Sequence, residues 1–415
     1  MNEIKKSRRA GTICRGEKAL IVAKAKEEHV AVDLYLREKA VLIWAITDKL
    51  TGVYVIMRKT SYLIPMKKLT VRCLICIFLT ALLLPVIAEA DHNMREIPVT
   101  DMDSICIGQT ENARAATGCT VFIAPNGMRA GLDVRGGGPA SRESQLLNPL
   151  MAAQQIHAIV LAGGSAYGLG AANGVMKYLE EHGIGYDTGY ALVPLVAQSD
   201  IYDLSVGDPS VRPDAVMGYE AARLAMEAPN YQDGNYGAGC GATVGKLAGM
   251  DYCMKSGIGS FAIQIDELKI GAVVVVNALG DVYDWRTGTQ IAGMLNENKT
   301  GLRSTLEYMR GSYAIVKNKF TSNTTICVVF TNACFDKAQL CKIAGMAHNG
   351  YARSINPVHT SADGDSIYAV SIGQIEADQD LVGVLAAEVV SEAITRAVTS
   401  ASGAYGHPAV SDLQK

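Results

Sequence analysis

The clearest candidate for chemistry is the segment 323–325, Asn-Thr-Thr, where two hydroxyl side chains head a short apolar, β-branched run. The run continues through 326–330, Ile-Cys-Val-Val-Phe, which is typical of a buried strand. If the chain is cut before Thr324, the new terminus carries a hydroxyl nucleophile and an α-amino group with a pKa of about 8, which can act as its base. A hydrogen-bonded turn and an N-glycosylation sequon fit the same residues, so this segment alone leaves three interpretations open.

A second candidate is the acidic pair Asp363 and Asp365, separated by one glycine. In an extended chain, residues i and i+2 point to the same side, so the two carboxylates are expected to lie together. There they can orient an ammonium group, either the amine of Thr324 or that of a substrate. A turn that uses Asp and Gly for its backbone angles is the simpler interpretation.

Two further motifs resemble catalytic loops but fail on spacing. The stretch 239–246 lacks the first glycine of a phosphate-binding loop, and Leu247 stands where Ser or Thr would bind magnesium. Around Ser165, a nucleophile elbow requires glycine where Tyr167 stands. We therefore expect no nucleotide, no other cofactor and no nucleophilic role for Ser165.

The composition narrows the class of protein. Among 415 residues, 49% are hydrophobic and 19% charged, as in a globular protein with a substantial core. The formal net charge of −3 offers no basic surface, so we predict no nucleic-acid partner. The histidines lack metal-binding spacing, and the cysteines after Ala90 form no C-x-x-C pair, so we predict no metal site.

Residues 66–90 have the pattern of a secretory signal peptide: a basic start at Met66, an apolar run at 74–87 and an Ala-Glu-Ala signature at 88–90. The apolar run is shorter than the ~20 residues that a membrane-spanning helix needs. We therefore expect Met66 to be the true start and the mature protein to be periplasmic or secreted, with no stable membrane anchor. Residues 1–65 are then a non-native or disordered extension; if they are native, the apolar run is an internal signal-anchor.

After Asp91, strand-like and helix-like runs alternate, which predicts a layered α/β protein. The polar stretch 286–322 before Thr324 is expected to be an exposed excursion where a cleavable loop can form. Strands are expected at 120–124, 131–135, 158–162, 269–277, 324–330 and 366–371. Helices are expected at 171–182, 214–226, 336–355 and 378–400.

Six segments carry a family resemblance: RGGGPASRES at 135–144, AIVLAGGSAYGL at 158–169, VNALGD at 276–281, NTTI at 323–326, MAHNGYAR at 346–353 and DGD at 363–365. In these segments the chain resembles the DmpA-type peptidases. That family includes L-aminopeptidase/D-alanyl-esterase-amidases, β-peptidyl aminopeptidases and nylon-oligomer (6-aminohexanoate oligomer) hydrolases. Asp363 and Asp365 match the acidic pair of the nylon-oligomer branch, whereas the aminopeptidase branch has Ser and Glu there.

The resemblance implies a fold and a maturation step. The fold is an αββα sandwich, layered like the N-terminal-nucleophile hydrolases and shared with ornithine acetyltransferase. The precursor cleaves itself into an α chain, residues 91–323, and a β chain, residues 324–415. The resemblance also implies a homotetramer of four αβ units and a cytoplasmic location, the usual one in the family, as the alternative to export.

The resemblance also assigns site residues. Thr324 is the nucleophile, and its amine, released by cleavage after Asn323, is the base. Asn277 offers an amide donor to the oxyanion. Lys246 lies beside the nucleophile, where a cation favours the deprotonated amine. Tyr202 matches a tyrosine of the catalytic site.

Together these features predict a self-processed N-terminal-threonine amidohydrolase or aminopeptidase. It would cleave short peptides or amine-bearing oligoamides through an acyl-enzyme. The alternative is acyl transfer as in ornithine acetyltransferase, whose Met-Ala-Thr-Met cleavage context differs from residues 322–325. A binding protein without activity is a third hypothesis, favoured if the chain never splits.

Overall fold

The computed structural model describes four strands between residues 19 and 59, and then residues 94–311 and 323–413. The chain forms two compact units, Met1–Ala90 and Asp91–Lys415. In the first unit, four strands pair antiparallel in chain order: β1 (Ala19–Lys26), β2 (His29–Leu36), β3 (Val41–Asp48) and β4 (Gly52–Lys59). That residues 1–65 are an extension stays a prediction, and the predicted signal peptide lies outside the described residues.

The second unit is built around one long strand, β7 (Thr117–Val134), which takes part in both halves of the main sheet. Its first half pairs with β6 (Cys106–Asn112) and β9 (Ile156–Ala162), and its second half pairs with β21 (Ser366–Ile375). The prediction of two separate strands here was wrong. Residues 125–127, Pro-Asn-Gly, have the composition of a turn but form an irregularity inside a continuous strand.

The strand order is β5-β15-β16-β19-β21-β7-β9-β12-β8, with β6 paired to β7. The pairs β19–β21 and β9–β12 are parallel, and the others are antiparallel. The remaining bounds are β5 (Met94–Ile97), β8 (Ala140–Arg142), β12 (Val196–Asp200), β15 (Ile258–Ile265), β16 (Leu268–Asn277) and β19 (Thr324–Ala333).

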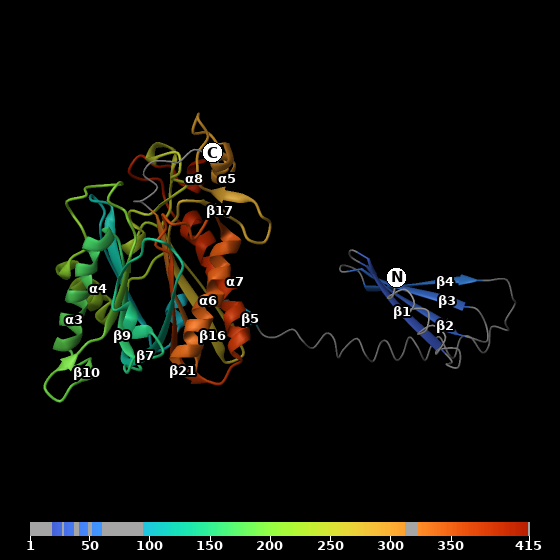
Figure 1. The fold of residues 1–415 in the computed structure, drawn as a ribbon, viewed down its shortest axis with the longest axis horizontal. Helices are drawn as coiled ribbons and strands as arrows, with labels where there is room; N and C mark the ends of the chain where they lie inside the picture. The colour runs from blue at the N-terminus through green and yellow to red at the C-terminus, as the bar shows by residue number, and fades with distance from the viewer. Residues whose placement is uncertain are drawn as a thin grey trace. The chain divides into compact units, whose positions relative to one another are not determined.

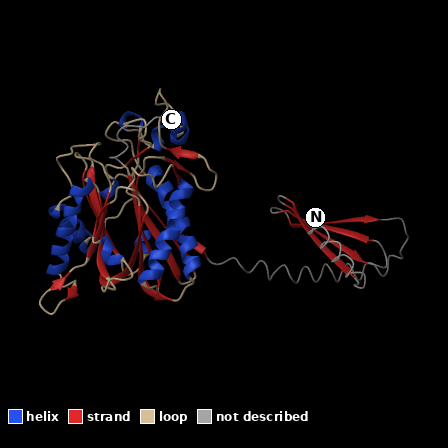
Figure 2. Cartoon of the chain, viewed as in Figure 1, coloured by secondary structure: helices blue, strands red, loops and turns tan. Residues whose placement is uncertain are grey.

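Helices cover both outer faces of the sheets (Figures 1 and 2). Helices α3 (Ala171–Glu181) and α4 (Ala215–Glu227) lie on one side, and α6 (Lys337–Ser354) and α7 (Gln379–Thr399) lie on the other. Three clusters of buried hydrophobic residues fill the spaces between the four layers. The predicted αββα sandwich is confirmed.

The central strands are apolar throughout because both of their faces are covered. On β16, Val273 and Val275 belong to the core between the sheets, whereas Val274 and Val276 belong to the core under α6 and α7. This alternation follows from the two-residue period of a strand. The sequence therefore located the strand well, since continuous apolar runs are typical of strands buried on both faces.

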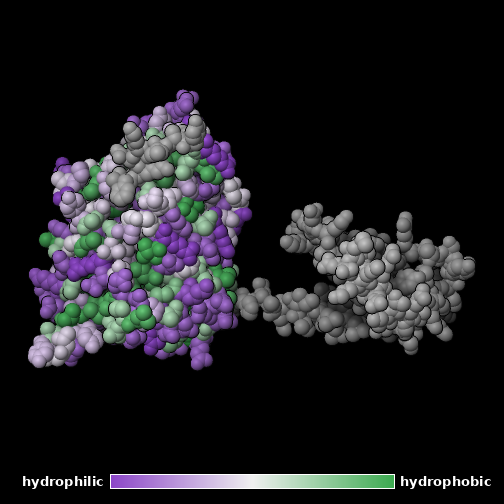
Figure 3. Space-filling view, viewed as in Figure 1, coloured by the Kyte–Doolittle hydropathy of each residue, from purple (hydrophilic) through white to green (hydrophobic). Residues whose placement is uncertain are grey.

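The four helices lie where they were predicted, and three begin at an aspartate. Asp214, Asp336 and Asp378 each accept a hydrogen bond from a main-chain N–H of the first turn. None of the helices that the structure describes is long and apolar enough to cross a membrane. On the face shown in Figure 3, hydrophobic residues lie in small groups between hydrophilic ones.

Short elements complete the unit at its ends. They are β10 (Tyr186–Asp187), β11 (Leu192–Val193), β13 (Thr243–Val244), β14 (Met254–Lys255), β17 (Asp281–Tyr283), β18 (Gln290–Ala292), α5 (Thr305–Gly311), β20 (Ile355–Asn356) and α8 (Val410–Leu413). The expected excursion at 286–322 contains β18 and α5, and residues 312–322 lie outside the described part.

Candidate active site

Thr324 is the first residue of β19 and is only 3% exposed. It lies opposite Asn277, the last residue of β16, in the antiparallel pairing of the two strands. The Thr324 hydroxyl donates a hydrogen bond to the main-chain carbonyl oxygen of Asn323. The predicted nucleophile therefore contacts the carbonyl group that it is predicted to attack.

Lys246 and Asn277 are joined by hydrogen bonds. Lys246 Nζ donates to Asn277 Oδ1 over 2.7 Å and to the Asn277 main-chain oxygen over 2.9 Å. The N–H of Thr243 also donates to Asn277 Oδ1, over 3.1 Å. Two donors on Oδ1 fix the orientation of the amide, so its nitrogen points away from the lysine.

Burial lowers the pKa of Lys246 from 10.5 to about 7, because the charged form loses its hydration. The thiol of Cys253 and the carboxyls of Asp363 and Asp203 act in the opposite direction. A lysine with this pKa is present as both ammonium and amine near neutral pH. It can therefore give up or accept a proton there.

Tyr202 contacts Asn277 through its main chain. The Asn277 side-chain nitrogen donates to the Tyr202 carbonyl oxygen over 3.0 Å. The structure thus places Tyr202 beside the site, as the resemblance implied. The contact is one that any residue type can make at this position, because it uses only the carbonyl group.

The acidic pair lies at the site, but each carboxylate has its own partners. Asp365 Oδ1 accepts from the N–H of Thr325 over 2.7 Å, and its Oδ2 accepts from His359 Nδ1 over 2.9 Å. Asp363 Oδ2 accepts from the hydroxyl and the N–H of Thr360 over 2.5 and 2.9 Å. Burial, and next the charge of Asp365, raise the pKa of Asp363 to about 6.

Sequence reasoning missed two residues of this loop. The N–H of Gly364 donates to the Asn323 carbonyl oxygen over 3.1 Å. His359 holds Asp365, and its ring lies 4.7 Å from that of His348 between centroids. His359 could have been found from the sequence, because it lies only a few residues before the acidic pair. The contact of Gly364 could not, because a main-chain hydrogen bond has no signature in the residue type.

The three glycines 136–138 let the end of β7 pass directly against this loop. The N–H of Gly138 donates to the Asp363 carbonyl oxygen over 2.8 Å, and that of Gly136 donates to the Asp365 carbonyl oxygen over 3.2 Å. A Cβ on Gly136 would lie 2.2 Å from the nitrogen of Asp365. Side chains here would therefore push the acidic loop away from Thr324.

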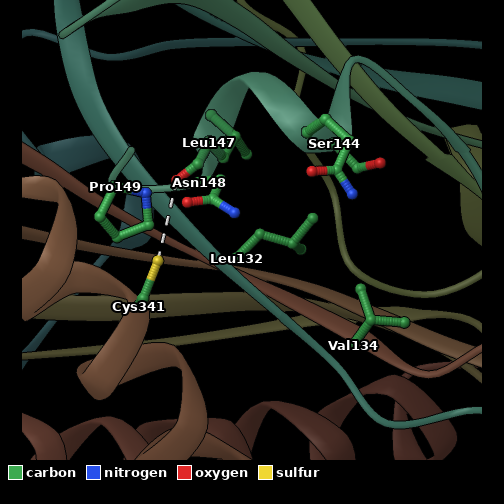
Figure 4. A pocket seen from close by; sticks show the side chains of 8 residues that line it. Leu132, Val134, Ser144, Leu147, Asn148, Pro149 and Cys341 are labelled. Atoms are coloured by element: carbon green, nitrogen blue, oxygen red, sulfur yellow. Dashed lines mark hydrogen bonds between the residues drawn. The ribbon is translucent and has the colours of Figure 1, made fainter. Parts of the chain in front are cut away.

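A separate hollow of about 250 Å³ lies between the end of β7, the segment 144–149 and the first turns of α6 (Figure 4). The Cys341 thiol contacts the Leu147 carbonyl oxygen across it, at 3.8 Å. None of the predicted site residues lines this hollow. It is therefore not the site of the proposed chemistry.

The described residues contain no group of three or more His, Cys, Asp or Glu that could hold a metal ion. The seven cysteines of the second unit are all unbridged, and four of them are buried: Cys119, Cys240, Cys253 and Cys327. In the stretch that resembles a phosphate loop, Lys246 is directed at Asn277. The arrangement around Thr324 thus consists of a hydroxyl, a carbonyl, a lysine, an amide and two carboxyls.

Residues 98–410 match the family described as peptidase family S58. The chain belongs to this peptidase family. The S58 peptidase is 37% identical to an uncharacterized aminopeptidase of Mycobacterium leprae over 338 aligned residues. The alignment covers 75% of this chain and 92% of that relative. It is 32% identical over 319 residues to the 6-aminohexanoate-oligomer endohydrolase of Agromyces sp., and this alignment covers 73% of this chain and 86% of that relative. The resemblance inferred from the motifs is confirmed.

Solved structures share the fold of the S58 peptidase. A β-aminopeptidase of Burkholderia sp. superposes with a TM-score of 0.53 at 20% identity, over 76% of this chain and 91% of that chain. The L-aminopeptidase D-Ala-esterase/amidase of Ochrobactrum anthropi gives a TM-score of 0.52 at 18% identity, over 73% of this chain and 86% of that chain. Its fold is described as a variant of the Ntn hydrolase fold.

The family and the relatives establish the general activity. The S58 peptidase is a hydrolase of the aminopeptidase and amidase type. Nothing in these matches supports the acyltransferase alternative.

Proposed function

We propose that the S58 peptidase cleaves itself between Asn323 and Thr324, and that Thr324 then hydrolyses the amide bonds of small substrates. The observation that carries this proposal is the contact between the Thr324 hydroxyl and the Asn323 carbonyl group at a buried strand start. A hydroxyl held against the preceding carbonyl can add to it with little further motion.

The proposed maturation has three steps. Thr324 Oγ1 adds to the carbonyl carbon of Asn323, and its proton passes to a base. The C–N bond then breaks, the nitrogen of Thr324 takes up a proton, and the acyl group remains on Oγ1 as an ester. Water hydrolyses the ester, which leaves a carboxylate on Asn323 and a free hydroxyl and amine on Thr324. The same hydroxyl can then form an acyl-enzyme with a substrate amide.

The surroundings support these steps electrostatically. Lys246, with its pKa of about 7, can exchange a proton near neutral pH, and as an ammonium it favours the neutral form of the new amine. The amide of Asn277 is fixed from its oxygen side by Lys246 and Thr243, which suits it as an oxyanion donor. Asp365 holds the N–H of Thr325 and so fixes the start of the new chain.

For the substrate, we propose short peptides or amine-bearing oligoamides. Support comes from the relatives, which are named as an aminopeptidase and as an endohydrolase of 6-aminohexanoate oligomers. Each carboxylate of the acidic pair already accepts a hydrogen bond, Asp365 from Thr325 and Asp363 from Thr360, so a substrate ammonium group would be an additional donor to them. We further propose a homotetramer of αβ units that acts in the periplasm or outside the cell; sedimentation and fractionation of the expressed protein test these two points.

The test is denaturing electrophoresis with N-terminal sequencing of the smaller fragment. We expect a fragment that begins Thr-Thr-Ile, and we expect Thr324→Ala to remove both the fragment and the amidase activity. The matched control is Thr325→Val, since the Thr325 hydroxyl has no hydrogen-bond partner among the described residues. This control should still split at the same bond. An intact single chain with full amidase activity would contradict the proposal.

A further inference from the structure

We propose that the main-chain N–H of Gly364 is the oxyanion donor of self-cleavage, and that it serves again for the carbonyl oxygen of each substrate. This inference rests on the proposed nucleophile, Thr324. In the structure the Gly364 N–H already donates to the Asn323 carbonyl oxygen, over 3.1 Å. That oxygen gains negative charge when Thr324 Oγ1 adds to the carbonyl carbon, and the hydrogen bond strengthens as the charge grows.

Gly364 also leaves room for the nucleophile. A Cβ placed on Gly364 would lie 2.7 Å from Thr324 Oγ1 and 2.9 Å from the carbonyl oxygen of Gly138. The position of a side chain on Gly364 is therefore already taken by the attacking hydroxyl and by the carbonyl group of Gly138. A side chain at this position would crowd the attacking hydroxyl, so glycine lets the N–H reach the Asn323 carbonyl oxygen while the hydroxyl keeps its place.

The peptide group that carries this N–H is polarised from its other end. The carbonyl oxygen of the same peptide group belongs to Asp363 and accepts a hydrogen bond from the Gly138 N–H over 2.8 Å. Hydrogen bonds in a chain strengthen one another, so the contact on the oxygen makes the Gly364 N–H a better donor.

The loop is held on both sides of Gly364. Before it, the side chain of Asp363 accepts hydrogen bonds from Thr360. After it, the side chain of Asp365 accepts from the N–H of Thr325, and its carbonyl oxygen accepts from Arg135 and Gly136. A donor fixed in this way needs no reorganisation when charge develops, which is the requirement for an effective oxyanion site.

The second role follows from the shared nucleophile. Thr324 Oγ1 attacks the Asn323 carbonyl once and a substrate carbonyl in every turnover, so both oxygens develop charge within reach of the same hydroxyl. When the new end of the α chain leaves, the buried Gly364 N–H loses its acceptor, and a substrate carbonyl oxygen restores the bond. The Asn277 amide, on the neighbouring strand, is the second donor expected for that oxygen.

The test replaces Gly364 by glycolic acid, which exchanges the N–H for an ester oxygen and adds no side chain. The matched control is the same replacement at Gly136, whose N–H donates within the same loop, to the Asp365 carbonyl oxygen, over 3.2 Å. We expect self-cleavage to slow by about 10²-fold at Gly364, as for other single oxyanion donors, and only a few-fold at Gly136. Equal melting temperatures of the two proteins show that both are folded.

The reuse of the donor is measured on Gly364→glycolic acid protein that has completed its slow cleavage. We expect kcat to fall with KM little changed, because the donor is needed mainly in the transition state. Cleavage at the rate of the Gly136 control would overturn the proposed donor. Slow cleavage followed by a wild-type kcat would overturn its reuse. A wild-type chain that never splits would contradict the proposed nucleophile instead, so the two failures are distinguishable.

Discussion

Two buried lysines of the hydrolase unit, Lys246 and Lys255, have the same pKa shift and different surroundings. Burial lowers the pKa of each from 10.5 to about 7. Lys246 donates to Asn277, a side chain at the candidate site. Lys255 donates to main-chain carbonyl oxygens, at 3.2 Å for Gly239 and 3.1 Å for Ala242, and also to that of Ser256.

The comparison shows that a lowered pKa does not by itself identify a catalytic lysine. Three carbonyl acceptors match the three donors of an ammonium group, so Lys255 is saturated and links its own strand, β14, to the segment 239–242. Lys246 instead orients a polar side chain opposite Thr324. The partners therefore separate a structural lysine from a candidate functional one, whereas the pKa does not.

The largest effect on stability is expected for Lys255→Met. Three buried hydrogen bonds would be lost. The carbonyl oxygens of Gly239 and Ala242 keep main-chain donors, so we expect about 1 kcal/mol for each of these and about 1–3 kcal/mol for that of Ser256. Together these are a large part of the roughly 5–15 kcal/mol that stabilises a domain. Denaturant unfolding of the purified protein, or loss of soluble protein on expression, measures this. A variant as stable as the wild type would show that Lys255 is not a structural lysine.

For Lys246→Met we expect the opposite pattern. Self-cleavage and amide hydrolysis should slow by about 10²-fold or more, as for loss of a proton-transferring group. The free energy of unfolding should change less than in Lys255→Met, because Asn277 Oδ1 keeps its hydrogen bond from Thr243. Time courses of cleavage on gels and unfolding curves test both parts. Normal cleavage in a destabilised protein would show that Lys246 is structural too.

The change that is smallest when counted per pH unit is the pH dependence of stability. Each lysine has a folded pKa of about 7 and an ordinary value of 10.5, so the unfolded chain binds more protons between these two pH values. Stability should therefore rise with pH through this window, by up to about 1.4 kcal/mol per pH unit for each lysine. Lys246→Met should remove one lysine's share of that slope. An unchanged slope in unfolding experiments would show that Lys246 is not neutralised in the folded protein.

The secondary structure could be predicted for elements whose environment is the same along their whole length. Strand β16 and helix α7 show their boundaries in the sequence through apolar runs and an aspartate cap at Asp378. Strand β7 could not be predicted as one element, because residues 125–127 read as a turn when the second sheet is unknown. Only pairing with partners on both sides makes the long strand favourable, and these partners are far away in the sequence.

The candidate site was predictable for residues that act through their side chains. Thr324 and the two aspartates were named from local motifs and Asn277 and Lys246 from the family resemblance, and the structure brings them together. Their proposed roles stay predictions until the variants are measured. Gly364 was missed because its contact with Asn323 is a main-chain hydrogen bond.

The sequence by itself located the four long helices and several of the buried strands, and its motifs carried the family resemblance that named the candidate nucleophile. The helices and strands depend on local periodicity and capping residues, which can be read from residue types, whereas the nucleophile follows from the resemblance. The tertiary structure alone decided which main-chain groups meet at Thr324, among them the N–H of Gly364 and the carbonyl of Asn323. The physical reason is that a peptide N–H or C=O is the same in almost every residue, so only the fold determines where it points.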